Sequence, residues 1–136
     1  MPKSLSVLIT DDSLRPFFED VLGETSEHAR FIGRVEDDKI LGVAAVFNFD
    51  GRSCEAGWCG DKGWMTLGFL NLLHDYIFNQ LKCVRVTALI DASNETAIKQ
   101  AERVGFQLEG RLREGAEDGD KLVYGMLKKD YKYVRR

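Results

Sequence analysis

The sequence predicts an α+β (mixed α/β) domain with a central, mostly antiparallel sheet of about seven strands and about three helices packed on it. Two observations support this fold class. Segments with the apolar pattern of strands are interrupted by three segments whose apolar residues recur at helical spacing. Short turns join the early strands into an antiparallel meander, and a strand–helix–strand–helix unit follows.

The N-terminal half predicts a strand, a helix and three further strands. Residues 5–9 are apolar and partly β-branched, as in a strand, and residues 11–23 have helical spacing that ends at Gly23. Three polar residues are candidate N-caps of this helix: Asp11, Asp12 and Ser13. Residues 29–60 have no helical period. Two turn signals divide them into strands: Asp37-Asp38 and Asp50-Gly51.

The C-terminal half predicts two helices and three strands. Residues 64–81 form a strongly apolar helix, and residues 83–90 read as a strand buried on both faces. A helix over residues 94–104 follows, with Ser93 and Asn94 as candidate N-caps and Gly105 as its left-handed end. The acidic turn at 115–120 joins the last two strands, 106–114 and 121–129.

Length and composition indicate one globular domain spanning residues 1–136. Hydrophobic residues make up 44% of the chain, which favours a packed core over disorder. The net charge of −3 gives no broad basic face, so nucleic acid is not an expected partner. The basic run at residues 128–136 is interpreted as a solvated tail.

Cysteine usage and the lengths of apolar runs predict an intracellular protein. The three cysteines, Cys54, Cys59 and Cys83, are odd in number and lack Cys-x-x-Cys spacing. This pattern argues against a disulfide framework and a metal site, and favours reduced thiols. The N-terminus does not resemble a signal peptide, and no apolar run approaches the ~20 residues of a membrane span. We therefore expect a cytoplasmic protein with no membrane partner.

Two strand-to-helix junctions are candidates for a binding site. The junction at 57–66 contains Gly60 and Gly63, which would allow a ligand close to the backbone, and its amides at a helix start can hold a phosphate. Lys62 would add a positive charge. The alternative is an ordinary turn. At the second junction, capping alone explains Ser93 and Asn94, because a cap stabilises a helix by ~1 kcal/mol. If the two strands splay, a crevice opens between the junctions.

The segment NETAIKQAERVGFQLEGRLR, residues 94–113, resembles the closing motif of the GNAT acetyltransferase superfamily. The resemblance spans residues 29–127 and is strongest to the branch that acetylates ribosomal protein N-termini. The chain also resembles short phage-encoded GNAT-like proteins, through Gly63-Trp64-x-Thr66 and Gly125-Met126-Leu127. The resemblance to the superfamily implies a GNAT-like sheet that is splayed in the middle. If a phage encodes the chain, the protein is expected in the host cytoplasm.

The resemblance implies acetyl-CoA as cosubstrate, with no metal, and direct transfer of the acetyl group to a primary amine of a small molecule or protein. The arm of acetyl-CoA would lie along three strand residues: Gly57, Trp58 and Cys59. Its pyrophosphate would lie on the following loop: Gly60, Asp61, Lys62, Gly63, Trp64, Met65 and Thr66. Asn94 would contact the arm from the far side.

The chain departs from the family pattern at three positions. Gly60 replaces the basic or glutamine residue that begins the family's loop, the bulky Met65 ends it, and Ala101 replaces a tyrosine that many members use as the acid. The alternative function is therefore a catalytically degenerate domain that binds a protein partner or belongs to an assembly. Edge strands of the small sheet could also pair in a homodimer.

Two residues are candidates for the chemistry. Glu55 is a candidate general base for the ammonium group of the acceptor, and the alternative is an exposed strand residue. Tyr124 is a candidate acid, and the alternative is packing in the core or at a sheet edge. The acidic loop at 113–120, with Glu114, Glu117, Asp118 and Asp120, either attracts a cationic amine or is a solvated hairpin turn.

Overall fold

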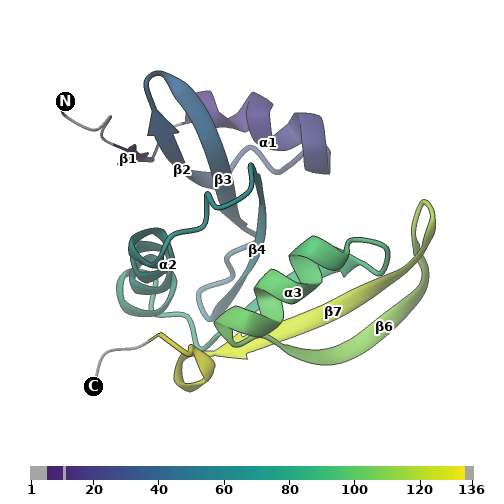
Figure 1. The fold of residues 1–136 in the computed structure, drawn as a ribbon. Coiled ribbons are helices and arrows are strands. Elements are labelled where there is room, and N and C mark those ends of the chain that lie inside the picture. The colour runs from purple at the N-terminus through teal and green to yellow at the C-terminus, as the bar shows by residue number, and fades with distance from the viewer. Residues whose placement is uncertain (1–5, 11, 134–136) are drawn as a thin grey trace.

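The computed structural model describes residues 6–10 and 12–133 (Figure 1). Within these residues the fold contains seven strands: β1 (Ser6–Ile9), β2 (Arg30–Glu36), β3 (Lys39–Phe47), β4 (Ser53–Gly60), β5 (Arg85–Asp91), β6 (Gln107–Ala116) and β7 (Gly119–Leu127). The described chain also forms three α-helices: α1 (Arg15–Leu22), α2 (Leu67–His74) and α3 (Glu95–Val104). The order of elements is the one that the sequence predicts.

The strands form one sheet in the order β1-β2-β3-β4-β5-β7-β6. Every neighbouring pair is antiparallel except β4 and β5, which are parallel. The parallel pairing covers only Ser53–Glu55 of β4 and Arg85–Thr87 of β5, and beyond it the two strands diverge. This confirms the mixed fold class and the sheet splayed in its middle.

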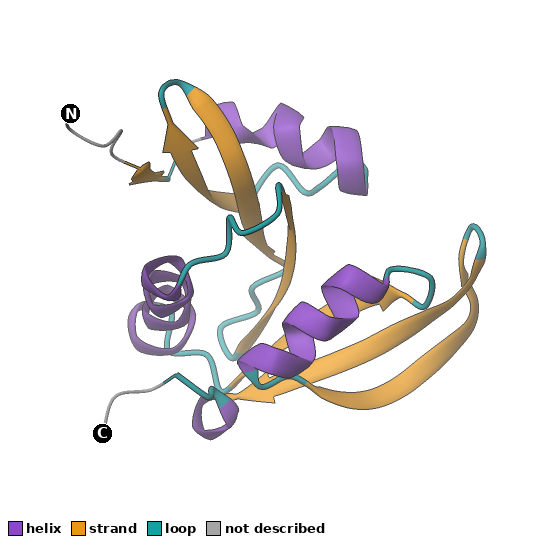
Figure 2. Ribbon diagram, in the orientation of Figure 1, coloured by secondary structure: helices purple, strands orange, loops and turns teal. Residues whose placement is uncertain are grey.

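The helices lie on opposite faces of the sheet (Figures 1 and 2). Helix α1 packs with β2 and β3, where Phe18 meets Phe31 edge-to-face at a centroid distance of 5.7 Å. Helices α2 and α3 share one apolar cluster over β4, β5 and β7 on the other face. Ala44 and Ala45 are neighbours on β3 and pack into clusters on different faces, as strand alternation requires.

Strand β5 buries one face only, so the prediction of a strand buried on both faces is wrong. Val86, Ala88 and Ile90 are buried, whereas Leu89 is 43% exposed. Helix α1 packs against β3 and β4 on that face, and Leu89 lines an open cavity beside it.

Two predicted helices differ from the structure in detail. A 3-10 turn at Asp12–Leu14 precedes α1, and the N-cap position is held by Leu14, which is fully buried and caps nothing with its side chain. Asp12 instead pairs with Arg15 at 2.9 Å, and Asp11 lies outside the described residues. The α-helical part of the second predicted helix, α2, ends at His74, and a π-helical segment follows directly over Asp75–Gln80.

Local signals at the other ends are confirmed. Gly23 follows α1 at φ +91°, and Asp37 and Asp38 both adopt positive φ in the β2–β3 turn. Asn94 caps α3 by accepting from the Ala97 amide at 3.2 Å. Gly105 follows α3 at φ +134°, and a Cβ there would overlap the Asp130 carbonyl.

The interpretation of the C-terminus as a solvated tail is wrong for Tyr131. Its ring stacks on His74 of α2 at a centroid distance of 4.2 Å, and its hydroxyl donates to Asn71 Oδ1 at 2.6 Å. Only 6% of Tyr131 is exposed. Residues 134–136 lie outside the described part of the chain. Among the helices that are described, none combines the length and the apolar character that crossing a membrane requires.

Candidate active site

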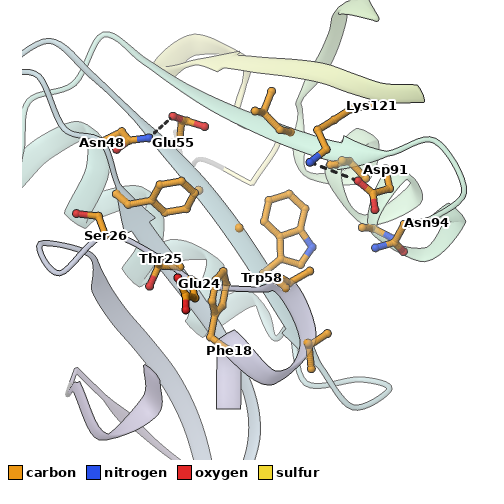
Figure 3. A pocket seen from close by; sticks show the side chains of 18 residues that line it. Phe18, Glu24, Thr25, Ser26, Asn48, Glu55, Trp58, Asp91, Asn94 and Lys121 are labelled. Atoms are coloured by element: carbon orange, nitrogen blue, oxygen red, sulfur yellow. Dashed lines mark hydrogen bonds and ion pairs between the residues drawn. The ribbon is translucent and has the colours of Figure 1, made fainter. Parts of the chain in front are cut away.

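A cavity of about 440 Å³ opens where β4 and β5 diverge (Figure 3). We call it the wedge cavity. Its lining includes Phe18 of α1 on one face of the sheet and Ala97 of α3 on the other. Because α1 and α3 lie on opposite faces, the cavity passes through the gap that the missing β4–β5 pairing leaves. Two reactants could therefore meet in it from opposite sides of the sheet.

The charged residues that line the wedge cavity are mostly acidic. Glu24 follows α1, Glu55 lies on β4, and Asp91 ends β5. Among the described residues that line the cavity, Lys121 is the one cation, and its Nζ lies 3.6 Å from Asp91 Oδ1. Surplus negative charge in a cleft attracts and concentrates cationic ligands. The electrostatics of the wedge cavity favour an ammonium group.

Glu55, the predicted base, projects into the wedge cavity and has a fixed neighbour. Its Oε2 accepts a hydrogen bond from Asn48 Nδ2 at 2.6 Å, as Figure 3 shows. Asn48 adopts φ +52°, a conformation that asparagine tolerates better than most residues. The sequence did not single out Asn48, because its relation to Glu55 comes from the pairing of β3 with β4.

The three predicted strand residues of the cofactor site take different positions. A Cβ at Gly57 would lie 3.1 Å from Phe18 Cζ, so the missing side chain lets α1 approach β4. Trp58 faces α3, where its Nε1 donates to Gln100 Oε1 at 3.0 Å. Cys59 faces α1, and burial raises the pKa of its thiol to about 11.

A groove of about 280 Å³ adjoins the wedge cavity and shares Trp58 and Asn94 with it. It brings together six of the predicted cofactor residues: Trp58, Cys59, Gly60, Asp61, Trp64 and Asn94. The two junctions thus meet in space, as expected if the strands splay. The groove does not include Lys62, Gly63, Met65 or Thr66. Met65 instead lines a small apolar cavity under α2.

The loop after β4 is held in place by a buried tryptophan. Trp64 is 2% exposed and packs edge-to-face on Phe69 of α2 at 4.7 Å. Its indole covers Gly42 and Gly60, and a Cβ at Gly60 would lie 2.6 Å from Trp64 Cγ. Gly60 lines the groove, but its missing side chain makes room for Trp64 and not for a ligand. Only the backbone of Trp64 can reach a ligand without unpacking.

Several polar groups of this loop bond to each other. The Trp64 amide donates to the Asp61 carbonyl at 3.1 Å, and the Thr66 amide donates to the Trp64 carbonyl at 3.0 Å. Thr66 Oγ1 accepts from the Phe69 amide at 3.3 Å and so caps α2. Gly63 has φ +80° and open space where a Cβ would be. The loop is a closed turn with fewer free amides than its length suggests.

The second junction is tied to the β6–β7 turn. Ser93 does not cap α3 with its side chain, since its hydroxyl donates to Asp118 Oδ2 at 2.7 Å. Asp120 in the same turn accepts from Arg111, and this hydrogen bond lowers the pKa of the Asp120 carboxyl. None of the residues 115–120 lines the wedge cavity, so local bonds account for the acidic turn better than contact with an acceptor.

Tyr124, the predicted acid, lies apart from Glu55. It is 2% exposed, and its hydroxyl donates to Glu102 Oε2 of α3 at 3.1 Å. Burial raises the pKa of Tyr124, and Glu102 raises it further. Tyr124 lines neither the wedge cavity nor the groove. Its role as acid stays a prediction, and its contacts indicate a structural link between β7 and α3.

The described residues contain no group of three or more His, Cys, Asp or Glu side chains that could hold a metal ion. The three cysteines are free, and Cys54 and Cys83 are buried beside each other. Burial raises the pKa of both thiols, which suits small core residues better than nucleophiles.

The splayed sheet and the two junctions that meet at the cavity are features that the resemblance to the GNAT superfamily implies. The family model described as acetyltransferase (GNAT) domain matches residues 3–107, and the chain therefore belongs to this family. The finer resemblance, to the ribosomal-protein branch and to phage-encoded proteins, stays a prediction.

Solved structures agree with this assignment. A protein described as "Probable acetyltransferase" is 25% identical, with a TM-score of 0.65. The match covers 88% of this chain and 69% of that chain. An acetyltransferase candidate from T. thermophilus is 25% identical, with a TM-score of 0.66 and coverage of 88% and 68%. The spermidine N-acetyltransferase SpeG from Vibrio cholerae is 16% identical, with a TM-score of 0.70 and coverage of 93% and 95%, which shows the shared fold alone. A comparison with curated proteins found no match.

Proposed function

We propose that the protein is an acetyl-CoA-dependent N-acetyltransferase whose acceptor is a cationic primary amine on a small molecule or protein. One observation carries the proposal: the β4–β5 pairing ends at Glu55, and the wedge cavity occupies the resulting gap, with acidic residues in its lining and the groove between α1 and α3 beside it. Family membership supports the acetyl-transfer chemistry. A cytoplasmic location and a homodimer stay predictions.

The cosubstrate would enter from the groove side. Beyond Glu55, the β4 backbone has no β5 partner, so its polar groups on that edge are available to the amides of the acetyl-CoA arm. Gly57, Trp58 and Cys59 form this edge, and Asn94 lies across it. The arm would thus pair with β4 as an added strand does. The thioester would lie near Glu55.

The amine would enter the wedge cavity from the acidic side. Glu55 would take a proton from the ammonium, directly or through a water, because only the neutral amine is a nucleophile. The amine nitrogen then bonds to the thioester carbon as the carbon–sulfur bond breaks, and the thiolate takes up a proton. Asn48 would keep the Glu55 carboxylate oriented during this transfer.

The charge of the wedge cavity favours a particular acceptor class. Glu24, Glu55 and Asp91 outnumber Lys121, which already pairs with Asp91. The spermidine N-acetyltransferase of Vibrio cholerae shares the fold and acts on a polycationic amine. Polyamines and the N-termini of basic peptides are therefore the first acceptors to screen.

A second candidate function is a degenerate domain that binds a protein partner without turnover. The observation that favours it is the closed loop after β4, where the Trp64 and Thr66 amides are already bonded. Ala101 adds to it, because this fully buried alanine replaces the tyrosine that many members of the family use as the acid. This alternative predicts a stable fold with no affinity for acetyl-CoA.

Calorimetric titration with acetyl-CoA separates the two candidates. A micromolar Kd, or ~8 kcal/mol of binding free energy, supports the enzyme. No binding at millimolar concentration supports the degenerate domain. Gly63→Glu and Gly63→Gln are matched variants, because both carry the same strain at φ +80° and differ in charge. We expect Gly63→Glu to lose more affinity, and equal loss would argue against a diphosphate at this loop.

Glu55→Gln tests the base in a thiol-release assay with an accepted amine. General base catalysis contributes typically 10²–10⁴-fold, so turnover should fall by at least about 100-fold while acetyl-CoA affinity stays the same. Glu36→Gln, on β2, is the control for loss of one carboxylate elsewhere on the sheet. Full activity of Glu55→Gln would remove Glu55 from the mechanism.

A further inference from the structure

The loop after β4 is held by an arginine from a distant strand. Arg34 lies on β2, and its Nη1 donates to the carbonyl oxygens of Gly63 at 3.4 Å and Trp64 at 3.1 Å. These residues are 29 and 30 positions apart from Arg34 in the chain. The loop itself begins with Gly60 and has no basic residue at its first position.

The two hydrogen bonds fix how the peptide groups of the loop are oriented. In a trans peptide the N–H points opposite to the C=O of the same unit, and the described residues contain no cis peptide bond. With the Trp64 carbonyl directed at Arg34, the Met65 N–H is directed away from β2. The Trp64 N–H is already bonded to the Asp61 carbonyl. The Trp64 carbonyl also accepts from the Thr66 amide at 3.0 Å, so Arg34 and the Thr66 amide together direct it, and Arg34 directs the Gly63 carbonyl.

This orientation matters because Gly63 can change it. Gly63 has φ +80°, and glycine populates positive and negative φ with similar ease. Without Arg34, the Gly63–Trp64 peptide is held less firmly, by the hydrogen bond from the Trp64 amide to the Asp61 carbonyl, and its rotation would present the Gly63 carbonyl oxygen to an anion at the loop. The one carboxylate in the loop, Asp61, is paired with Lys39 of β3 at 3.3 Å. Both features keep negative ends away from a bound phosphate.

We propose that Arg34 is a positioning residue for the diphosphate of coenzyme A. It acts through the backbone of Gly63 and Trp64 and compensates, from β2, for the basic residue that the loop lacks at its first position. This inference rests on the proposed function, since it requires that the loop receives the diphosphate.

The test compares coenzyme A with pantetheine, which has the arm without the diphosphate. We expect Arg34→Gln to weaken coenzyme A binding by about tenfold and to leave pantetheine binding within about twofold of the wild type, as loss of one charge-assisted contact would. Arg30→Gln is the matched control, because it removes the same charge from the same strand at an exposed position. It should bind both ligands like the wild type.

Each outcome has a definite meaning. If the wild type binds neither ligand, the proposed function fails and this inference with it. If the wild type binds coenzyme A and Arg34→Gln binds it equally well, only the role of Arg34 is wrong. If Arg34→Gln weakens the binding of coenzyme A and of pantetheine equally, Arg34 has only a structural role, and the inference is overturned. If Arg34→Gln does not fold, Arg34→Lys should show a smaller, still selective loss for coenzyme A.

Discussion

Gly60 offers a direct test of how the loop after β4 is anchored. The substitution Gly60→Ala places a Cβ 2.6 Å from Gly42 Cα and 2.6 Å from the Trp64 indole. Gly60 does not have a positive φ, so alanine meets no backbone penalty there. Any loss of stability in this variant therefore reports steric crowding between β3, β4 and Trp64.

The size of the effect follows from the contacts. Both distances must grow by nearly 1 Å to reach ordinary packing, and one of the two atoms belongs to the β3 backbone, which cannot rotate away. Overpacking a well-filled core typically costs 1–3 kcal/mol. We expect the upper end for Gly60→Ala, about 3 kcal/mol. In a chain of this length that lowers Tm by roughly 10 °C.

Urea and thermal unfolding measure this effect, with Gly68→Ala as the control. Gly68 lies in the first turn of α2, and a Cβ added there would have nothing within 4 Å. Because alanine favours helix by up to ~1 kcal/mol over glycine, Gly68→Ala should be neutral or stabilising. A loss of unfolding free energy below about 0.5 kcal/mol for Gly60→Ala lies within the range of ordinary surface substitutions. That result would refute the conclusion that Trp64 is rigidly packed against Gly60.

Two further predictions concern ionisable groups. Burial lowers the pKa of His74, so the unfolded chain takes up that proton first as pH falls. The stabilising contribution of neutral His74 is therefore complete above about pH 6.5 and is lost as pH falls toward the folded-state pKa. In urea unfolding, His74→Phe should make the free energy of unfolding decline less steeply as pH falls. An unchanged pH slope in this variant would contradict the role of His74. Because burial raises the pKa of Cys59 to about 11, its thiol should react slowly with a disulfide reagent at neutral pH in the native protein and quickly in urea. Fast native reaction would show that the Cys59 site opens.

Local signals in the sequence predicted the elements and their ends. Gly23 and Gly105 end helices at positive φ, and Asn94 caps α3, because caps and turns depend on residues within a few positions of each other. The closing motif at 94–113 also predicted the family that the match over residues 3–107 shows. These features need no knowledge of distant contacts.

Other predictions failed where a distant segment decides the outcome. Leu89 is exposed because it lines the wedge cavity, and Tyr131 is buried because α2 offers it His74 and Asn71. Position 60 requires glycine because a side chain there would overlap the Trp64 indole. In the sequence, Trp64 is only a nearby residue of the same loop. In each case the outcome depends on a distant or buried neighbour that the local sequence pattern does not reveal.

The sequence by itself determined the order of strands and helices, the helix ends and the acetyltransferase family, since these are properties of contiguous residues. Only the tertiary structure decided that Asn48 orients Glu55, that Arg34 holds the Gly63 and Trp64 carbonyls, and that the wedge cavity passes through the sheet. The physical reason is strand register. The β3–β4 pairing brings Asn48 to Glu55, and the early end of the β4–β5 pairing leaves the gap that the wedge cavity occupies.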